Sequence, residues 1–80
     1  MRYYFHLDQN NERVTDDHGV ELSNFGLARR LAVATATEIA ASELKEGLDQ
    51  VEQRIVVTDE GGRKLLSVVL EAELSLREWS

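Results

Sequence analysis

The sequence predicts an α+β fold, in which an antiparallel sheet of two β-hairpins has one helix packed on one face, in the order β-β-α-β-β. Residues 53–70 contain two β-branched and apolar arms on both sides of a glycine pair, and Leu66, Val68 and Leu70 share one face of the second arm, as in a β-hairpin. Residues 2–7 alternate in the same way, and an alanine-rich stretch between the two hairpins has the composition of a helix. Because the chain has 80 residues and no linker-like segment, we expect a single domain over residues 1–80.

The first hairpin is expected to begin with a strand over residues 2–7, where aromatic side chains and a period of two favour an extended chain. Residues 8–11 are expected to turn, since Asn and Asp tolerate a left-handed backbone. Residues 12–15 then return as a short second strand, and residues 16–19 break it. Residues 20–22 are expected to form a further brief extended piece.

One helix is expected to begin at Ser23 or Asn24 and to end at Gly47. Ser and Asn are both preferred N-cap residues, and glycine commonly ends a helix because it adopts a left-handed conformation without a Cβ clash. Small residues on one side would let the helix lie close to the sheet. The side expected to face the sheet contains Ala28, Leu31, Ala32, Thr35, Ile39 and Ser42.

The second hairpin is expected to turn at residues 59–62, where Gly61 or Gly62 takes a positive φ. The sequence leaves open which face of the first arm looks inward, because Ile55 with Val57 and Val56 with Thr58 both qualify. The residues expected to be largely buried are Phe5, Leu7, Leu31, Ile39, Ile55, Val57, Leu66 and Val68.

The tail after Leu70 allows two interpretations. Its apolar residues keep a period of two, which favours an extended chain. Glu, Ala and Leu, which are abundant in it, also form helices, but its apolar residues do not gather on one helical face. An extended tail is therefore favoured, and a helical one stays open.

The composition excludes several classes of partner. The formal net charge is −6, so a phosphate backbone or an anionic membrane surface would be repelled. The longest apolar run is far shorter than the roughly 20 residues that a membrane-spanning helix needs. No cysteine is present, which fits a reducing compartment. We expect a cytoplasmic protein with neither nucleic acid nor membrane as a partner.

Residues with catalytic or metal-binding potential are few. Asp16, Asp17 and His18 form the densest polar cluster and offer oxygen and nitrogen ligands that a divalent cation could use. The same residues are better explained as a turn, and His6 as a half-buried strand histidine bonded to a neighbour or to water. No serine lies in a nucleophile elbow, and no Lys-Ser/Thr pair follows the glycine pair. We expect no enzymatic activity, no catalytic residue, no cofactor and no metal.

Four short motifs occur in a fixed order along the chain. They are Arg2-Tyr3-Tyr4-Phe5-His6-Leu7, then Asp16-Asp17-His18-Gly19-Val20-Glu21-Leu22, an alanine-containing helix around Ala28-Arg29, and Val57-Thr58-Asp59-Glu60-Gly61-Gly62-Arg63. In this order they resemble a family of short bacterial proteins, mostly from alphaproteobacteria, known only as a domain of unknown function. The resemblance extends over residues 2–70, and Asn10-Asn11 departs from the Asp-Gly type of turn common in such proteins. It implies no activity, cofactor or catalytic residue.

The expected function is contact between proteins, first of all self-association into a homodimer. The sheet has two potentially open edges, which pair readily with other strands. A second helical stripe, on nearly the opposite side from the first, is a candidate partner surface. The sheet face without the helix is another, because exposed apolar area costs about 25 cal/mol per Å² in water. The stripe consists of Val33, Thr37, Ala40 and Leu44, and the open face of Tyr4, His6 and, depending on register, Leu65 and Val69. The extended tail through Leu76 and Trp79 is a third candidate surface.

Other functions stay open beside self-association. An unidentified second protein is a further candidate partner. A small metal- or ligand-binding protein would use the loop that contains Asp16 and His18. An acidic regulator of a nucleic-acid-binding partner would use the negative net charge.

Overall fold

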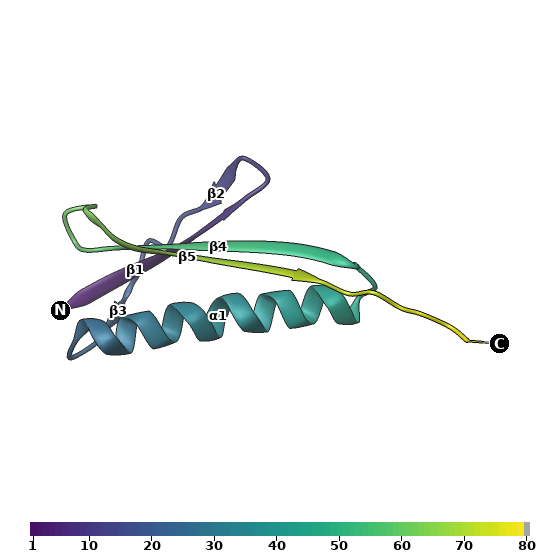
Figure 1. Cartoon of the computed structure of the whole chain (residues 1–80). Coiled ribbons are helices and arrows are strands. Elements are labelled where there is room, and N and C mark those ends of the chain that lie inside the picture. The colour runs from purple at the N-terminus through teal and green to yellow at the C-terminus, as the bar shows by residue number, and fades with distance from the viewer. Residues whose placement is uncertain (80) are drawn as a thin grey trace.

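The computed structural model describes residues 1–79. It contains one helix and an antiparallel sheet in the order β2-β1-β4-β5, with β3 paired to β1 beside β2 (Figure 1). The predicted α+β fold is confirmed, and the extended piece expected after the second strand contributes β3. The elements are β1 (Arg2–Gln9), β2 (Glu12–Val14), β3 (Val20–Glu21), α1 (Phe25–Lys45), β4 (Gln50–Thr58) and β5 (Lys64–Glu73).

The molecule is a thin two-layer structure. Helix α1 runs along β4 and β5 on one side, and the tip of the β1–β2 hairpin rises away on the other (Figure 1). The principal extents are 57 × 25 × 16 Å. The radius of gyration is 14.9 Å, against roughly 12 Å for a compact chain of this length. The extended tail contributes to this difference, and so does the single layer of sheet.

Polar and glycine residues fix both ends of α1. Asn24 has an extended backbone, and its Oδ1 accepts a hydrogen bond from the N–H of Leu27 at 3.0 Å, as an N-cap does. At the other end Gly47 has φ +103°, and its N–H donates to the carbonyl of Leu44 at 3.1 Å. The helix therefore ends where the sequence predicts, and of the two possible caps Asn24 is used. No helix within residues 1–79 is long and apolar enough to span a membrane.

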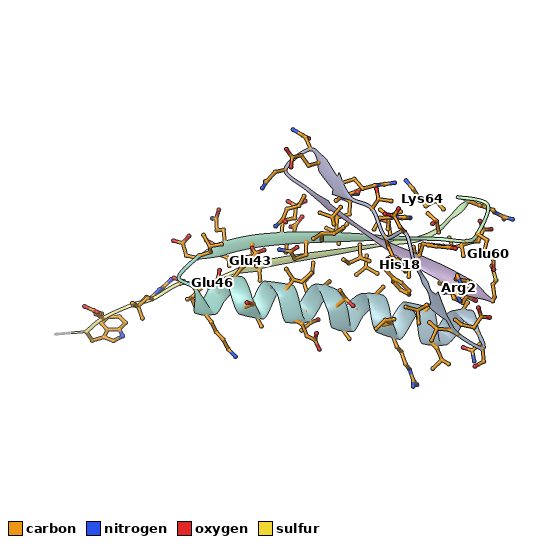
Figure 2. All side chains as sticks on the ribbon, turned by 180° about the vertical axis from the view of Figure 1, so that it is seen from behind. Arg2, His18, Glu43, Glu46, Glu60 and Lys64 are labelled. Atoms are coloured by element: carbon orange, nitrogen blue, oxygen red, sulfur yellow. The ribbon has the colours of Figure 1, made fainter. Side chains whose placement is uncertain are left out.

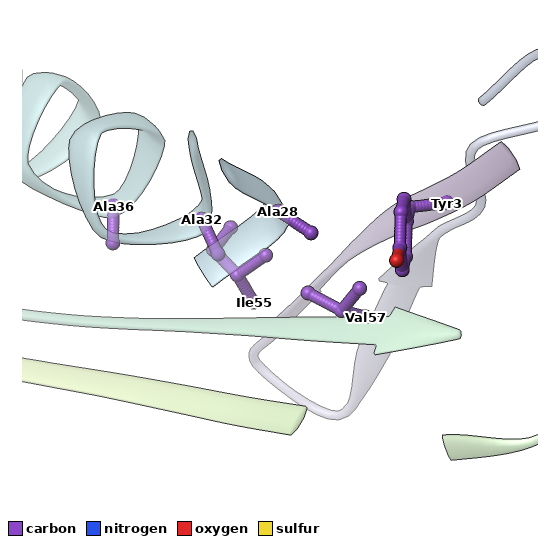
Figure 3. Close-up of a cluster of buried hydrophobic side chains, with 6 residues drawn as sticks. All are labelled: Tyr3, Ala28, Ala32, Ala36, Ile55 and Val57. Carbon is purple, nitrogen blue, oxygen red and sulfur yellow. The ribbon is translucent and has the colours of Figure 1, made fainter. Parts of the chain in front are cut away.

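Alanines form the contact between the helix and the sheet. A spacing of four residues drifts by about 40° per step around a helix, so this line of alanines winds slowly and follows the twisted sheet. Without long side chains between them, α1 and β4 pack closely, with Ile55 and Val57 on the sheet side (Figure 3). Ser42, which was expected on this face, is exposed. The buried helix residues are Ala28, Ala32, Ala36 and Ala40.

The core is smaller than the sequence suggests. Of the eight residues expected to be largely buried, Ile55 and Val57 are fully buried, and the other six are half-buried. Tyr3 joins the buried cluster instead. The six are not fully buried because the large side chains lie beside the alanine line rather than beneath it. One helix within residues 1–79 covers the sheet, so the margins of its face stay partly exposed. Phe5, Leu7, Leu66 and Val68 pack against the buried cluster from its margins.

The two hairpin turns use positive φ angles, as predicted. Asn10 and Asn11 have φ of 53° and 64° and form the two-residue connection between β1 and β2. In the second turn Gly62 has φ +81°, and its N–H donates to the carbonyl of Asp59 at 3.0 Å. The Asp59 carboxylate also accepts from the N–H of Gly61 at 2.9 Å.

The chain after Leu70 is extended, as the period of two favours. β5 continues to Glu73, and the N–H of Leu74 donates to the carbonyl of Asp49 at 2.7 Å. Residues 74–79 have no regular secondary structure and leave the body of the molecule (Figure 1). Their large apolar side chains are exposed, up to 90% for Trp79.

Candidate functional site

The polar loop between β2 and β3 is held together by Asp16. Its Oδ2 accepts a hydrogen bond from the N–H of Phe5 at 3.1 Å, on the outer edge of β1. Its Oδ1 accepts from the N–H groups of His18 at 3.1 Å and Gly19 at 3.0 Å. The carboxylate therefore replaces the backbone acceptor that a continuous strand would supply between β2 and β3. Asp16 is a structural residue of this edge.

The pKa of Asp16 reflects these contacts. Partial burial raises it, but the three backbone N–H donors, on Gly19, Phe5 and His18, together outweigh burial and hold the pKa below its usual value. The ionised carboxylate is therefore the form that the fold stabilises.

Gly19 lets the loop approach β1 closely. Its φ is +70°, a conformation that L side chains rarely adopt. A Cβ at this position would lie 2.9 Å from both the carbonyl oxygen of Tyr3 and Cγ of Arg2. The Asp16 and Gly19 pair thus makes the turn that the sequence allowed as one of two interpretations.

His6 joins this loop to β4. Its Nδ1 accepts a hydrogen bond from the N–H of Asp16 at 3.1 Å, which places the ring proton on Nε2, 2.9 Å from Oγ1 of Thr58. His6 is 8% exposed, and its cross-strand neighbour Val56 is buried as well. The prediction of a strand histidine bonded to a neighbour is confirmed. His6 also lies on the sheet face without the helix, as expected, but the face is not open there, because the loop encloses the side chain.

The loop does not bring a set of metal ligands together. The carboxylate of Asp16 is used by three N–H groups, and both ring nitrogens of His6 are used. Asp17 and His18 are exposed. In the part of the chain that the structure describes, no three His, Cys, Asp or Glu side chains are placed to share an ion.

The sheet face without the helix is mostly polar. The register of β4 and β5 slips by one residue between Val57 and Thr58, so that Lys64 rather than Leu65 pairs with Thr58. Leu65 consequently packs against the core on the helix side. Tyr4 is half-buried, and Val69 is 44% exposed among charged and polar neighbours. The apolar open face predicted from Tyr4, His6, Leu65 and Val69 is therefore wrong.

The second helical stripe is also not a continuous surface. Ala40 is buried against the sheet and Leu44 is half-buried, whereas Val33 and Thr37 are exposed. The alanine contact line crosses from the first stripe to the second along the helix, because its spacing is four residues. The prediction of a separate partner-facing stripe on α1 is therefore wrong.

The outer edge of β5 is open along its whole length. β5 is the last strand of the sheet, and no other strand within residues 1–79 pairs with its outer side. The N–H of Leu74 points to β4, so alternation directs the N–H and C=O groups of Ser67, Val69 and Glu71 outward. From Leu66 to Glu73 the register with β4 is regular, and the sequence contains no proline. Such an edge is a template for a further strand.

A polar layer at the far end of the helix was not expected. Gln53 is fully buried on the helix side of β4, and its Nε2 donates to Oε1 of Glu43 at 2.6 Å. Nε2 of Gln9 donates to the same oxygen at 3.1 Å. The sequence contained a signal for this layer, because Gln53 interrupts the apolar residues at every second position of β4.

The comparison with known families agrees with the resemblance in the sequence. A family described as a domain of unknown function (DUF6894) matches residues 2–71. The chain belongs to this family. No curated protein and no solved structure matches the chain. Membership in DUF6894 assigns no activity, so a function has to be argued from the geometry of the molecule.

Proposed function

We propose that this member of DUF6894 is a non-enzymatic domain that works by contact between proteins, and that it forms a symmetric dimer with a second copy. The open edge of β5 supports this proposal most directly. Natural sheets usually protect such edges with short strands, proline or a covering loop. The regular edge from Leu66 to Glu73 has none of these, which fits a strand that pairs with a partner.

The charges along β5 match an antiparallel copy of the same strand. The strand region begins with Arg63 and Lys64 and ends with Glu71 and Glu73. A two-fold axis perpendicular to the sheet runs two copies antiparallel, so the basic end of each lies beside the acidic end of the other. A parallel arrangement would place like charges together. The strand is thus complementary to itself in one orientation.

The apolar residues of β5 also support pairing with a second copy. Leu66, Val68 and Leu70 face the helix side and are half-buried, because α1 covers the sheet incompletely at this edge. A second sheet placed beside β5 would bring its own copies of these side chains next to them. Burial of apolar surface and pairing of backbone groups would then stabilise the same interface.

The other parts of the proposal rest on residue chemistry and composition. The contacts of Asp16 and His6 go to groups that hold the fold, which supports a role without catalysis. The sequence has no cysteine, which supports a reducing compartment, and we place the domain in the cytoplasm.

Charge reversal at the two ends of β5 tests the dimer. The variant Arg63→Glu/Lys64→Glu has only acidic ends, and the variant Glu71→Lys/Glu73→Lys has only basic ends. Each should sediment as a single chain, because like charges meet at both ends of the pair. An equimolar mixture should sediment as a heterodimer, since acidic ends then meet basic ends twice.

A matched control reverses charges on the exposed surface of α1, with Arg29→Glu and Glu38→Lys, and should dimerise as the unmodified chain does. An unmodified chain that sediments as a monomer over the whole micromolar range would overturn the dimer. Variants that each dimerise as well alone as in the mixture would overturn the β5 interface.

A further inference from the structure

A groove lies at the end of the molecule where the helix stops. It is bounded by the tip of the β1–β2 hairpin, the start of β4 and the last turn of α1, and its volume is about 1070 Å³. Figure 2 shows Glu43 and Glu46 at this end of the helix, far from Glu60 and Lys64 at the other end of the sheet. This groove does not involve the outer edge of β5.

One wall of the groove is a free strand edge. β1 pairs with β4 as far as Asp8 and Arg54, and beyond this point the hairpin turns away. On this side, no strand in the described part of the chain pairs with residues 50–53 of β4. Because the even-numbered residues of β4 direct their backbone groups towards β1, Gln50 and Glu52 present N–H and C=O groups to the groove.

The groove is strongly acidic. Asp8 is neutralised by Arg13, whose Nε and Nη2 donate to the two carboxylate oxygens at 2.6 and 2.9 Å. Arg54 is the other basic residue that lines the groove. The negative end of the α1 dipole adds to the effect, since the last turn of the helix borders the groove. The remaining carboxylates that line it are Glu12, Glu43, Glu46 and Glu52.

The polar layer beside the groove lacks hydrogen-bond donors. The amides of Gln9 and Gln53 both donate to Oε1 of Glu43, which lines the groove. Oε1 of Gln53 is buried and accepts no hydrogen bond from any described residue. Gln53 is fully buried and does not line the groove, so this acceptor is not reached from the groove. The carboxylates that line the groove, Glu43 among them, therefore favour a cationic side chain.

We propose that this groove binds an extended segment of another protein that carries Lys or Arg side chains. The backbone of the segment adds to the free edge of β4 at Gln50 and Glu52, and its basic side chains reach Glu43, Glu46 and Glu52. The tail of a second copy does not fit this description, because Arg77 and Glu78 cancel each other. The ligand is therefore a basic strand supplied by a different chain.

The test uses fluorescence anisotropy with the full chain and a short labelled peptide that alternates Lys and Thr. The groove variant is Glu46→Gln/Glu52→Gln, in which both residues are exposed and the fold is not at risk. Its affinity should fall about tenfold, because two ion pairs of ordinary strength are lost. The control variant Glu38→Gln/Glu60→Gln removes the same charge outside the groove and should bind as the unmodified chain does.

Two further peptides separate strand addition from general attraction of charges. A Lys-Thr peptide with a methyl group on every backbone nitrogen keeps the charge but has no backbone donor on either side, and it should bind more weakly. A peptide that alternates Glu and Thr should not bind. Equal loss of affinity in the groove and control variants would overturn the groove, and equal binding of the Lys-Thr peptide and its N-methylated form would overturn strand addition. The dimer through β5 is measured separately, so either proposal can fail alone.

Discussion

The two outer edges of the sheet differ in how completely their backbone groups are used. On the β1 side, β2 covers one part of the edge, β3 covers another, and the carboxylate of Asp16 accepts the N–H of Phe5 in the gap between them. On the β5 side, no described residue pairs with the outward backbone groups from Leu66 to Glu73.

This contrast shows that edge protection in a small sheet can be built from very short pieces. A three-residue strand, a two-residue strand and one carboxylate are enough to close the β1 edge. The same chain leaves the edge of β5 open, which supports the proposal that a partner strand pairs there.

The largest effect is expected at the closed edge from Gly19→Ala. The new Cβ would meet the backbone oxygen of Tyr3 at 2.9 Å in a residue with φ +70°. Strain and the clash together should lower the free energy of unfolding by about 3 kcal/mol, measured by urea denaturation. Gly47→Ala is the matched control, because φ is +103° but the space is open, and it should cost about 1 kcal/mol. Equal losses in both variants would show that Gly19 does not need close contact with β1.

Asp16→Ala should have the next largest effect. It leaves the N–H groups of Phe5, His18 and Gly19 without their acceptor, and the first of these lies within the sheet. We expect a loss of about 2 kcal/mol in the free energy of unfolding. Asp17→Ala changes an exposed neighbour and should stay within about 0.5 kcal/mol of the unmodified chain. A loss as small as this for Asp16→Ala would contradict its structural role.

Asp16 should also make stability depend on pH. Its pKa is lower in the folded chain than in the unfolded one, so the stabilisation is complete above the usual Asp value and is lost as pH falls through the folded pKa. The urea midpoint should therefore drop between neutral pH and about pH 3, and Asp16→Asn should flatten this dependence. The pKa of Asp8 is also lowered, mainly by its hydrogen bonds with Arg13. Asp8 therefore adds its own decrease in stability at low pH, and this decrease should remain in Asp16→Asn.

The smallest effect on stability is expected on the open edge from Val69→Lys. Val69 is 44% exposed, so the free energy of unfolding of the monomer should change by less than about 0.5 kcal/mol. A lysine in the middle of this strand should nevertheless prevent pairing, because in an antiparallel pair the two copies of the new positive charge would lie close to each other. Val33→Lys, at a helix position that is 47% exposed, should leave the sedimenting mass unchanged. Loss of the dimer in both variants would point to an interface on the helix instead.

The sequence alone was sufficient to predict the local structure of the caps, turns and strands. Asn24, Gly47 and Gly62 occupy the cap and turn positions that their residue types favour, because these preferences depend on the backbone of a few neighbours. The first strand and the strands of the second hairpin followed from the period of two, and the short second strand from the turn before it. The extended tail also followed from the period of two.

The surfaces depend on distant parts of the chain and could not be derived in this way. The contact with the sheet was assigned to the first helical stripe, which holds Ala28 and Ala32, whereas the alanine line continues through Ala36 to Ala40 on the second stripe, because its four-residue spacing follows the twist of the sheet. His6 was placed on an open face, but Asp16 and Thr58 enclose it from segments that are remote in sequence. The register slip beside Thr58 moved Leu65 to the helix side. Each of these errors concerns which face a residue takes after long-range pairing.

Hydrogen exchange of single amides, followed over a range of chain concentrations, compares the two edges directly. The N–H of Phe5 is held within the chain by Asp16 and should be protected at every concentration. The outward N–H groups of Ser67, Val69 and Glu71 should be protected at high concentration and should exchange rapidly on dilution, as the dimer dissociates. Rapid exchange of these three amides at all concentrations, with Phe5 still protected, would contradict pairing through β5.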